Sequence, residues 1–147
     1  MPPFGRRPLL LLGLPLLGAC DDPWSGRWYS DEQVQRGETV FEANCAECHA
    51  ERARGADGWR QRLPDGTFPP PPLDGSGHAW HHPLDGLRQI ITDGQRRMPG
   101  FGDELSEEDV DAVIAWFPDH WDDDIHEAWE EYDRRGMAGH DPAQDAW

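Results

Sequence analysis

Residues 45–49 carry the pattern that most restricts how this chain can fold. They read Cys45-Ala46-Glu47-Cys48-His49, so two thiols lie three positions apart and an imidazole follows directly. Thiols at this spacing can add to the two vinyl groups of a haem as thioethers, while the histidine reaches the iron from one face. The pattern therefore predicts one covalently attached haem c on Cys45 and Cys48, and the rest of the chain has to build its pocket.

Residues 1–19 are predicted to be a lipoprotein signal peptide. Two arginines precede an apolar stretch, 9–17, that is shorter than the roughly 20 residues of a membrane-spanning helix. It ends in Leu-Gly-Ala-Cys, which resembles the bacterial lipobox, in which the cysteine is acylated. Acylated Cys20 would anchor the protein in the periplasm without a spanning helix, and the two following aspartates resemble a signal for the inner membrane. An ordinary signal peptide cut nearby is the alternative, with Cys20 a remaining thiol.

The charge of the chain is strongly negative, with 29 acidic residues against 13 basic ones, all of them arginine. This balance argues against binding to nucleic acid or to a membrane surface through a basic helix. The acids concentrate in the last third, where 16 lie within residues 103–147 together with two arginines. Two interpretations stay open: a face that docks a redox partner carrying a positively charged patch, or a well-solvated acidic tail.

Four helices are predicted from apolar residues at helical spacing and from start and stop signals. They span residues 30–45, 83–94, 106–117 and 122–135. Ser30 with Gln33, and later Ser106, are the expected capping residues, and Pro118 is expected to end the third helix. Residues 50–82 show no helical or strand period, and wrapping around a flat cofactor would explain so long an irregular stretch.

The order of these elements over residues 30–117 resembles the class I cytochrome c family. In that family a helix precedes the Cys-x-x-Cys-His motif, a proline-containing loop and a second helix follow, and a methionine loop precedes a capped last helix. His49 matches the proximal iron ligand, and Met98 matches the sixth ligand in a sequence similar to Met-Pro-x-Phe-Gly. Pro71, in a Pro-x-Leu-x-Gly sequence, matches the residue whose carbonyl accepts a hydrogen bond from the ligand imidazole.

The resemblance implies an all-α, class I cytochrome c-like fold, with three core helices and loops wrapped around one covalently attached haem. The C-terminal amphipathic helix is additional to this fold. Gly37 in the first helix is expected to lie against Trp116 in the last core helix, because glycine permits a close approach. The implied organisation is a signal peptide (1–19), a tether (20–29), a cytochrome c domain (30–118) and an acidic helix with a disordered tail (119–147).

A histidine-rich segment surrounds Trp80, with imidazoles at 78, 81 and 82. His78, His81 and His82 could bind Cu or Zn, replace an iron ligand, or contact the surface and the haem propionates. The indole N–H of Trp80 is a candidate donor to a propionate. The three histidines nearer the C-terminus are expected to be exposed: His120, His126 and His140.

With His49 and Met98 on both faces of the iron, no position would remain for a substrate. The resemblance therefore implies a membrane-tethered periplasmic electron carrier rather than an enzyme. A haem c subunit of a larger oxidoreductase complex is the first alternative, and a peroxidase-like enzyme would need an open iron position. A metal-binding module built on the histidine-rich segment is less favoured. A thiol redox protein is disfavoured by His49 and by the lack of predicted strands.

Overall fold

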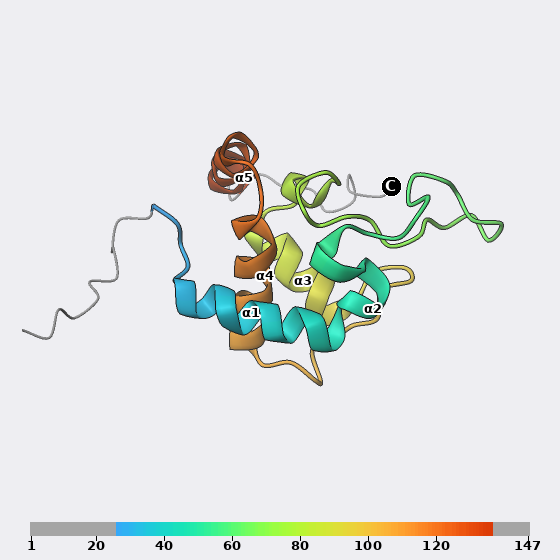
Figure 1. Cartoon of the computed structure of the whole chain (residues 1–147), viewed down its shortest axis with the longest axis horizontal. Helices are drawn as coiled ribbons and strands as arrows, with labels where there is room; N and C mark the ends of the chain where they lie inside the picture. Colours follow the sequence, from blue (N-terminus) through green and yellow to red (C-terminus); the bar gives the residue numbers. More distant parts are fainter. Residues whose placement is uncertain (1–25, 137–147) are drawn as a thin grey trace, which may run out of the picture.

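The computed structural model describes residues 26–136, which form helices joined by loops (Figure 1). The helices are α1 (Asp31–Asn44), α2 (Ala46–His49), α3 (Leu84–Asp93), α4 (Glu107–Asp119) and α5 (Asp123–Gly136), with 3₁₀ turns at Glu51–Ala53 and Ala79–His81. The predicted all-α class is confirmed, with three core helices and one additional C-terminal helix. The predicted signal peptide, most of the predicted tether and the predicted tail from 137 onward lie outside the described residues. Within 26–136, no helix has the length and apolar character needed to cross a membrane.

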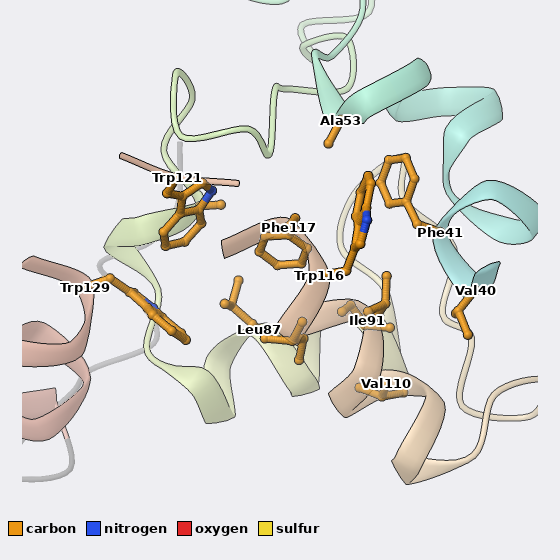
Figure 2. Close-up of a cluster of buried hydrophobic side chains, with 13 residues drawn as sticks. Val40, Phe41, Ala53, Leu87, Ile91, Val110, Trp116, Phe117, Trp121 and Trp129 are labelled. Atoms are coloured by element: carbon orange, nitrogen blue, oxygen red, sulfur yellow. The ribbon is translucent and has the colours of Figure 1, made fainter. Parts of the chain in front are cut away.

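The crossing of α1 and α4 is the tightest contact between helices. A β-carbon placed on Gly37 would lie 2.0 Å from the carbonyl oxygen of Ala112 and 2.7 Å from Cβ of Trp116. One turn further along α1, the rings of Phe41 and Trp116 lie with their centroids 4.3 Å apart. Figure 2 shows this ring pair at one side of the core. The expected contact between Gly37 and Trp116 is present, and it fixes the end of α1 from which the Cys45–His49 segment continues.

Helix caps and ion pairs hold α1, α3 and α4 in register. Ser30 and Ser106 both form capping boxes, as predicted. Arg88 of α3 donates to Asp111 of α4 at 2.7 Å. The prediction that Pro118 ends the third helix is wrong by one residue, because α4 continues to Asp119. Pro118 is fully buried, and its carbonyl accepts the N–H of Trp121 at 3.0 Å, so the chain keeps turning beyond the proline.

Helix α5 folds back on the loop that precedes α3. Trp129 is 1% exposed, and its indole N–H donates to the carbonyl of His82 at 2.8 Å. Asp133 accepts the backbone N–H of Leu84 at 2.6 Å and so caps the start of α3. Trp121, in the link between α4 and α5, meets Trp129 edge to face, with centroids 5.5 Å apart (Figure 2). The C-terminal helix is thus part of the same hydrophobic core.

Candidate functional site

The two motif cysteines lie where α1 turns into the short helix α2. Cys45 ends α1 by donating its N–H to the Phe41 carbonyl at 2.8 Å, and His49 N–H returns to the Cys45 carbonyl at 2.9 Å. This single helical turn therefore holds the two thiols and the imidazole close together. Cys45 is half-buried, Cys48 is exposed, and both are free thiols. Both sulfurs are therefore available for covalent attachment.

The imidazole of His49 is buried and oriented by the backbone. Its Nδ1 lies 2.9 Å from the carbonyl oxygen of Pro71. A carbonyl can only accept, so Nδ1 donates, and this tautomer leaves the lone pair of Nε2 free to bind a metal. Burial lowers the pKa of His49, while the Pro71 bond acts in the opposite direction. The neutral imidazole, which is the ligating form, is thereby favoured.

Backbone contacts on both sides fix the Pro71 carbonyl in place. The N–H of Ala56 donates to the Pro70 carbonyl at 2.9 Å, and the N–H of Leu73 donates to the Ala53 carbonyl at 2.7 Å. Gly55, with φ of +77°, lies between these bonds, and a β-carbon there would be 2.7 Å from the carbonyl carbon of Pro71. Residues 70–73 are thus packed directly on residues 53–56, just after the motif.

Met98 lies in a tight turn held against the end of α3. Gln95 and Met98 exchange two backbone hydrogen bonds of 3.0 and 2.9 Å, and Phe101 N–H donates to the Ile91 carbonyl at 2.9 Å. The Met98 side chain is half-buried and packs on the same hydrophobic core as Cys45. Arg97, next to it, pairs with Asp65 at 2.8 Å and ties this turn to the preceding loop. The turn thus presents a soft thioether from a well-anchored backbone.

Unusual backbone conformations concentrate beside His49 and Met98. In the part of the chain that the structure describes, four residues other than glycine have positive φ. Three of them lie within four positions after His49, namely Ala50, Arg52 and Ala53. The fourth, Arg96, precedes Met98 by two positions. Such conformations cost about 1–3 kcal/mol each and persist where the surroundings enforce them, often at functional sites. They mark the same two segments as the sequence motifs do.

The thiol chemistry does not suit a dithiol redox site. Burial raises the pKa of Cys45 to about 11, with a further contribution from the charge of Cys48. Dithiol oxidoreductases need a thiolate, so their reactive cysteines have lowered pKa values. The pKa of the Cys45 thiol is raised instead, which disfavours the thiolate.

The histidine-rich segment is not assembled as a metal site. Residues 26–136 contain no group of three or more His, Cys, Asp or Glu side chains that could hold a metal ion. His81 is exposed and stacks on Trp80, with ring centroids 3.7 Å apart, while His82 is buried and His78 stacks on Trp59. The rings of His78 and His82 lie near each other, with centroids 5.8 Å apart, whereas His81 is turned toward Trp80. Trp80 is half-buried on the core, so its expected propionate contact stays a prediction.

The sequence reasoning missed a buried polar group on α5. His126 was expected to be exposed, but it is 3% exposed, and its Nε2 lies 3.0 Å from the Tyr29 hydroxyl. Burial lowers the pKa of His126 to about 4 and raises that of Tyr29 to about 12. The signal was available, because His126 lies three residues before Trp129 and so shares its helix face. His120 is exposed as predicted, and His140 lies outside the described residues.

The donor set fits a covalently attached haem. Two free thiols follow a helix end, a neutral imidazole keeps Nε2 for iron, and its Nδ1 proton has the backbone partner that ligand histidines usually need. A thioether, the other common axial ligand of c-type haem iron, is carried by the Met98 turn.

Comparison with known proteins points in the same direction. Residues 32–117 match the family described as cytochrome c oxidase, cbb3-type, subunit III. Cytochrome c6 from Bumilleriopsis filiformis is 31% identical over 83 residues, which cover 56% of this chain and 86% of that protein. Cytochrome c6 from Porphyra purpurea is 33% identical over 83 residues, with coverages of 56% and 67%.

A solved structure supports the fold. The crystal structure of cytochrome CL from the marine methylotrophic bacterium Methylophaga aminisulfidivorans is similar, with a TM-score of 0.50 and 22% identity. The match covers 78% of this chain and 72% of that one.

Proposed function

Because this chain belongs to the class I cytochrome c family and carries covalently attached haem c, we propose that it is a membrane-tethered electron carrier with His49 and Met98 as the axial iron ligands. Haem-based electron transfer is the activity of the family. The observation that carries the choice of ligand is the 2.9 Å hydrogen bond from His49 Nδ1 to the Pro71 carbonyl, within the Cys-x-x-Cys-His segment. It aligns the ring and leaves Nε2 for the iron.

Each residue of the site has a distinct task in this proposal. The haem would supply one-electron chemistry, because its iron is stable in both a ferrous and a ferric state. Cys45 and Cys48 hold the haem by thioethers, so the group is not lost during repeated cycles. Met98 contributes a neutral, soft sulfur, which favours the ferrous state and raises the reduction potential relative to two histidine ligands. Both axial positions are then filled, which favours electron transfer over catalysis at the iron.

The ligation is tested on the purified haem-loaded protein with two matched methionine variants. The ferric parent is expected to show a low-spin spectrum with a methionine–iron charge-transfer band. Met98→Leu should abolish that band and lower the reduction potential, whereas Met137→Leu should leave both unchanged. A charge-transfer band that survives Met98→Leu would contradict the assignment, and a high-spin, five-coordinate parent would contradict the closed iron site.

The membrane tether is proposed from the lipobox-like sequence that ends at Cys20. Acylation of Cys20 would hold the domain at the inner membrane of a bacterium, on its periplasmic side. In membrane fractionation the parent should sediment with the inner membrane, and Cys20→Ser should be released into the periplasm. A Cys20→Ser protein that still sediments with membranes would argue against the lipid anchor.

The redox partner is proposed to carry a positively charged docking patch. Eight acids lie between Asp119 and Asp133, most of them exposed, against two arginines at the end of α5. Attraction to such a face should raise the association rate at low salt and weaken as ionic strength rises. An electron-transfer rate to the native partner that does not change between low and high salt would count against this docking mode.

A second candidate function is that of a haem c subunit in a larger oxidoreductase complex. The observation that favours it is the description of the matching family, which is subunit III of an oxidase. Affinity capture from detergent-solubilised native membranes separates the two candidates. A stoichiometric partner enzyme would favour the subunit, and recovery of the protein alone would favour the free carrier.

A further inference from the structure

Trp121 makes a contact that lies beyond the residues that match the family. The family match ends at residue 117, and Trp121 follows α4 by two positions. The side chain is 4% exposed, and its indole N–H donates to the carbonyl of Leu73 at 2.8 Å. Gly75, with φ of +92°, lets the loop lie against the indole, because a β-carbon there would be 3.1 Å from Cδ1. The indole is therefore seated on the loop by both packing and a hydrogen bond.

Leu73 is coupled to the bond that orients His49. It follows Pro71 by two positions, and the two prolines, Pro71 and Pro72, have restricted φ and no N–H to donate. The segment is therefore held at its two ends: at Pro70, whose carbonyl accepts from Ala56, and at Leu73. The N–H of Leu73 donates to the Ala53 carbonyl at 2.7 Å, and its carbonyl accepts from Trp121. A displacement of Leu73 has few soft torsions to absorb it before it reaches the Pro71 carbonyl.

We propose that Trp121 is a positioning residue for the proximal ligand His49. By fixing the Leu73 carbonyl, it keeps the Pro71 carbonyl aligned with Nδ1 of His49. This inference rests on the proposed ligation of iron by His49. A well-aligned carbonyl makes the imidazole a stronger donor, which stabilises ferric iron. Loss of the Trp121 hydrogen bond should therefore weaken the donor and raise the reduction potential.

A purely structural role is the competing explanation, since Trp121 also packs on Phe117 and Trp129, with ring centroids 5.9 and 5.5 Å away. Trp121→Phe keeps an aromatic ring in this place and removes only the N–H and one ring. Trp129→Phe is the matched control, because it makes the same chemical change. Trp129 donates to the carbonyl of His82, which lies outside the Pro71–Leu73 segment.

The experiment measures two properties of the haem-loaded protein that report on the His49 imidazole, and Trp129→Phe controls for the change in packing. They are the reduction potential and the NMR exchange rate of the His49 Nδ1 proton. A hydrogen bond such as that from Trp121 to the Leu73 carbonyl is worth about 0.5–1.5 kcal/mol net. If its loss weakens the bond from His49 to Pro71 by the same amount, the Nδ1 proton of His49 should exchange roughly two- to tenfold faster. Trp121→Phe is expected to raise the potential and accelerate exchange by this factor, whereas Trp129→Phe should leave both at the parent values.

Equal potentials and exchange rates in the two variants would overturn the proposal. If Trp121→Phe does not fold, Gly75→Ala displaces the indole from the other side and should shift both readouts in the same direction. No shift in that variant would overturn the proposal as well. The proposed ligation is judged separately on the parent, where an iron ligand must show His49 resonances shifted by the haem. Shifted resonances in a parent whose Trp121→Phe variant is unchanged would defeat only this inference.

Discussion

The substitution Gly37→Ala tests whether the crossing of α1 and α4 holds the haem-attachment segment in place. The new β-carbon would lie 2.0 Å from the Ala112 carbonyl oxygen and 2.7 Å from Cβ of Trp116. Relaxed contacts between heavy atoms lie near 3.5 Å, so the two helices would have to separate by about 1 Å or more. Neither contact atom belongs to the flexible end of a side chain, so rotation of a side chain cannot relieve the clash.

The magnitude follows from two opposing effects. Overpacking a well-packed contact costs about 1–3 kcal/mol, and the upper end applies where backbone has to move. Alanine is better than glycine inside a helix by about 1 kcal/mol, which offsets part of the loss. Gly37→Ala should therefore lower the free energy of unfolding by about 2 kcal/mol. The separation would also loosen the stacking of Phe41 on Trp116, close to Cys45.

The assay is urea unfolding of the haem-loaded protein, followed by far-ultraviolet circular dichroism. Gly86→Ala in α3 is the matched control, since its β-carbon would lie 3.2 Å from the ring of Pro83 and 4.0 Å from Cβ of His82, with no backbone atom among these contacts. In Gly86→Ala, the gain in helix propensity and the cost of this mild contact should nearly cancel, so the free energy of unfolding should stay close to that of the parent. An unfolding midpoint of Gly37→Ala at or above that of the parent would refute the reasoning about the crossing.

Two further predictions concern α5. The pKa of His126 is about 4 in the folded chain and about 6.5 when unfolded, so the unfolded chain binds more protons in this window. Stability should therefore fall by about 2 kcal/mol as pH drops from 6.5 to 4, which is less than the roughly 3.4 kcal/mol of the full pKa difference because solvent screens part of the effect. His126→Gln should no longer lose stability over this pH range, whereas His120→Gln should lose it as the parent does. Equal slopes of the unfolding free energy against pH in the two variants, measured by urea titration, would contradict this prediction. Asp133→Ala removes the cap on Leu84 and should cost about 1 kcal/mol of thermal stability, against no change for the exposed Glu127→Ala.

Local signals in the sequence predicted the helical frame well. The capping residues Ser30 and Ser106 act through neighbours three positions away, so the sequence alone carries both partners. The glycine at position 37 also had an identifiable partner, because a glycine inside a helix needs a close neighbour to explain it. The hydrogen bond from His49 to Pro71 could be expected only because the surrounding motif resembles a known family.

The contacts of α5 could not be predicted in the same way. Its amphipathic pattern indicated a helix, but the choice between folding back and facing a partner depends on atoms that are 47 residues apart in the chain, as in the bond from Trp129 to the His82 carbonyl. Burial of His126 requires Tyr29 as its partner, 97 positions away. Composition gave no hint of this pair, since a histidine among acids is usually solvated.

Because α5 packs on the core, the family match and the folded unit end at different residues. The family match ends at residue 117, whereas a long-range hydrogen bond of the described residues reaches Asp133, whose carboxylate accepts the N–H of Leu84. A chain cut where the similarity stops would leave the carbonyls of Leu73 and His82 without their indole donors. The loop that carries the Pro71 carbonyl is therefore braced by a segment outside the family match, through the bond from Trp121 to Leu73. Recognition of the motif and support of the loop behind it depend on different parts of the chain.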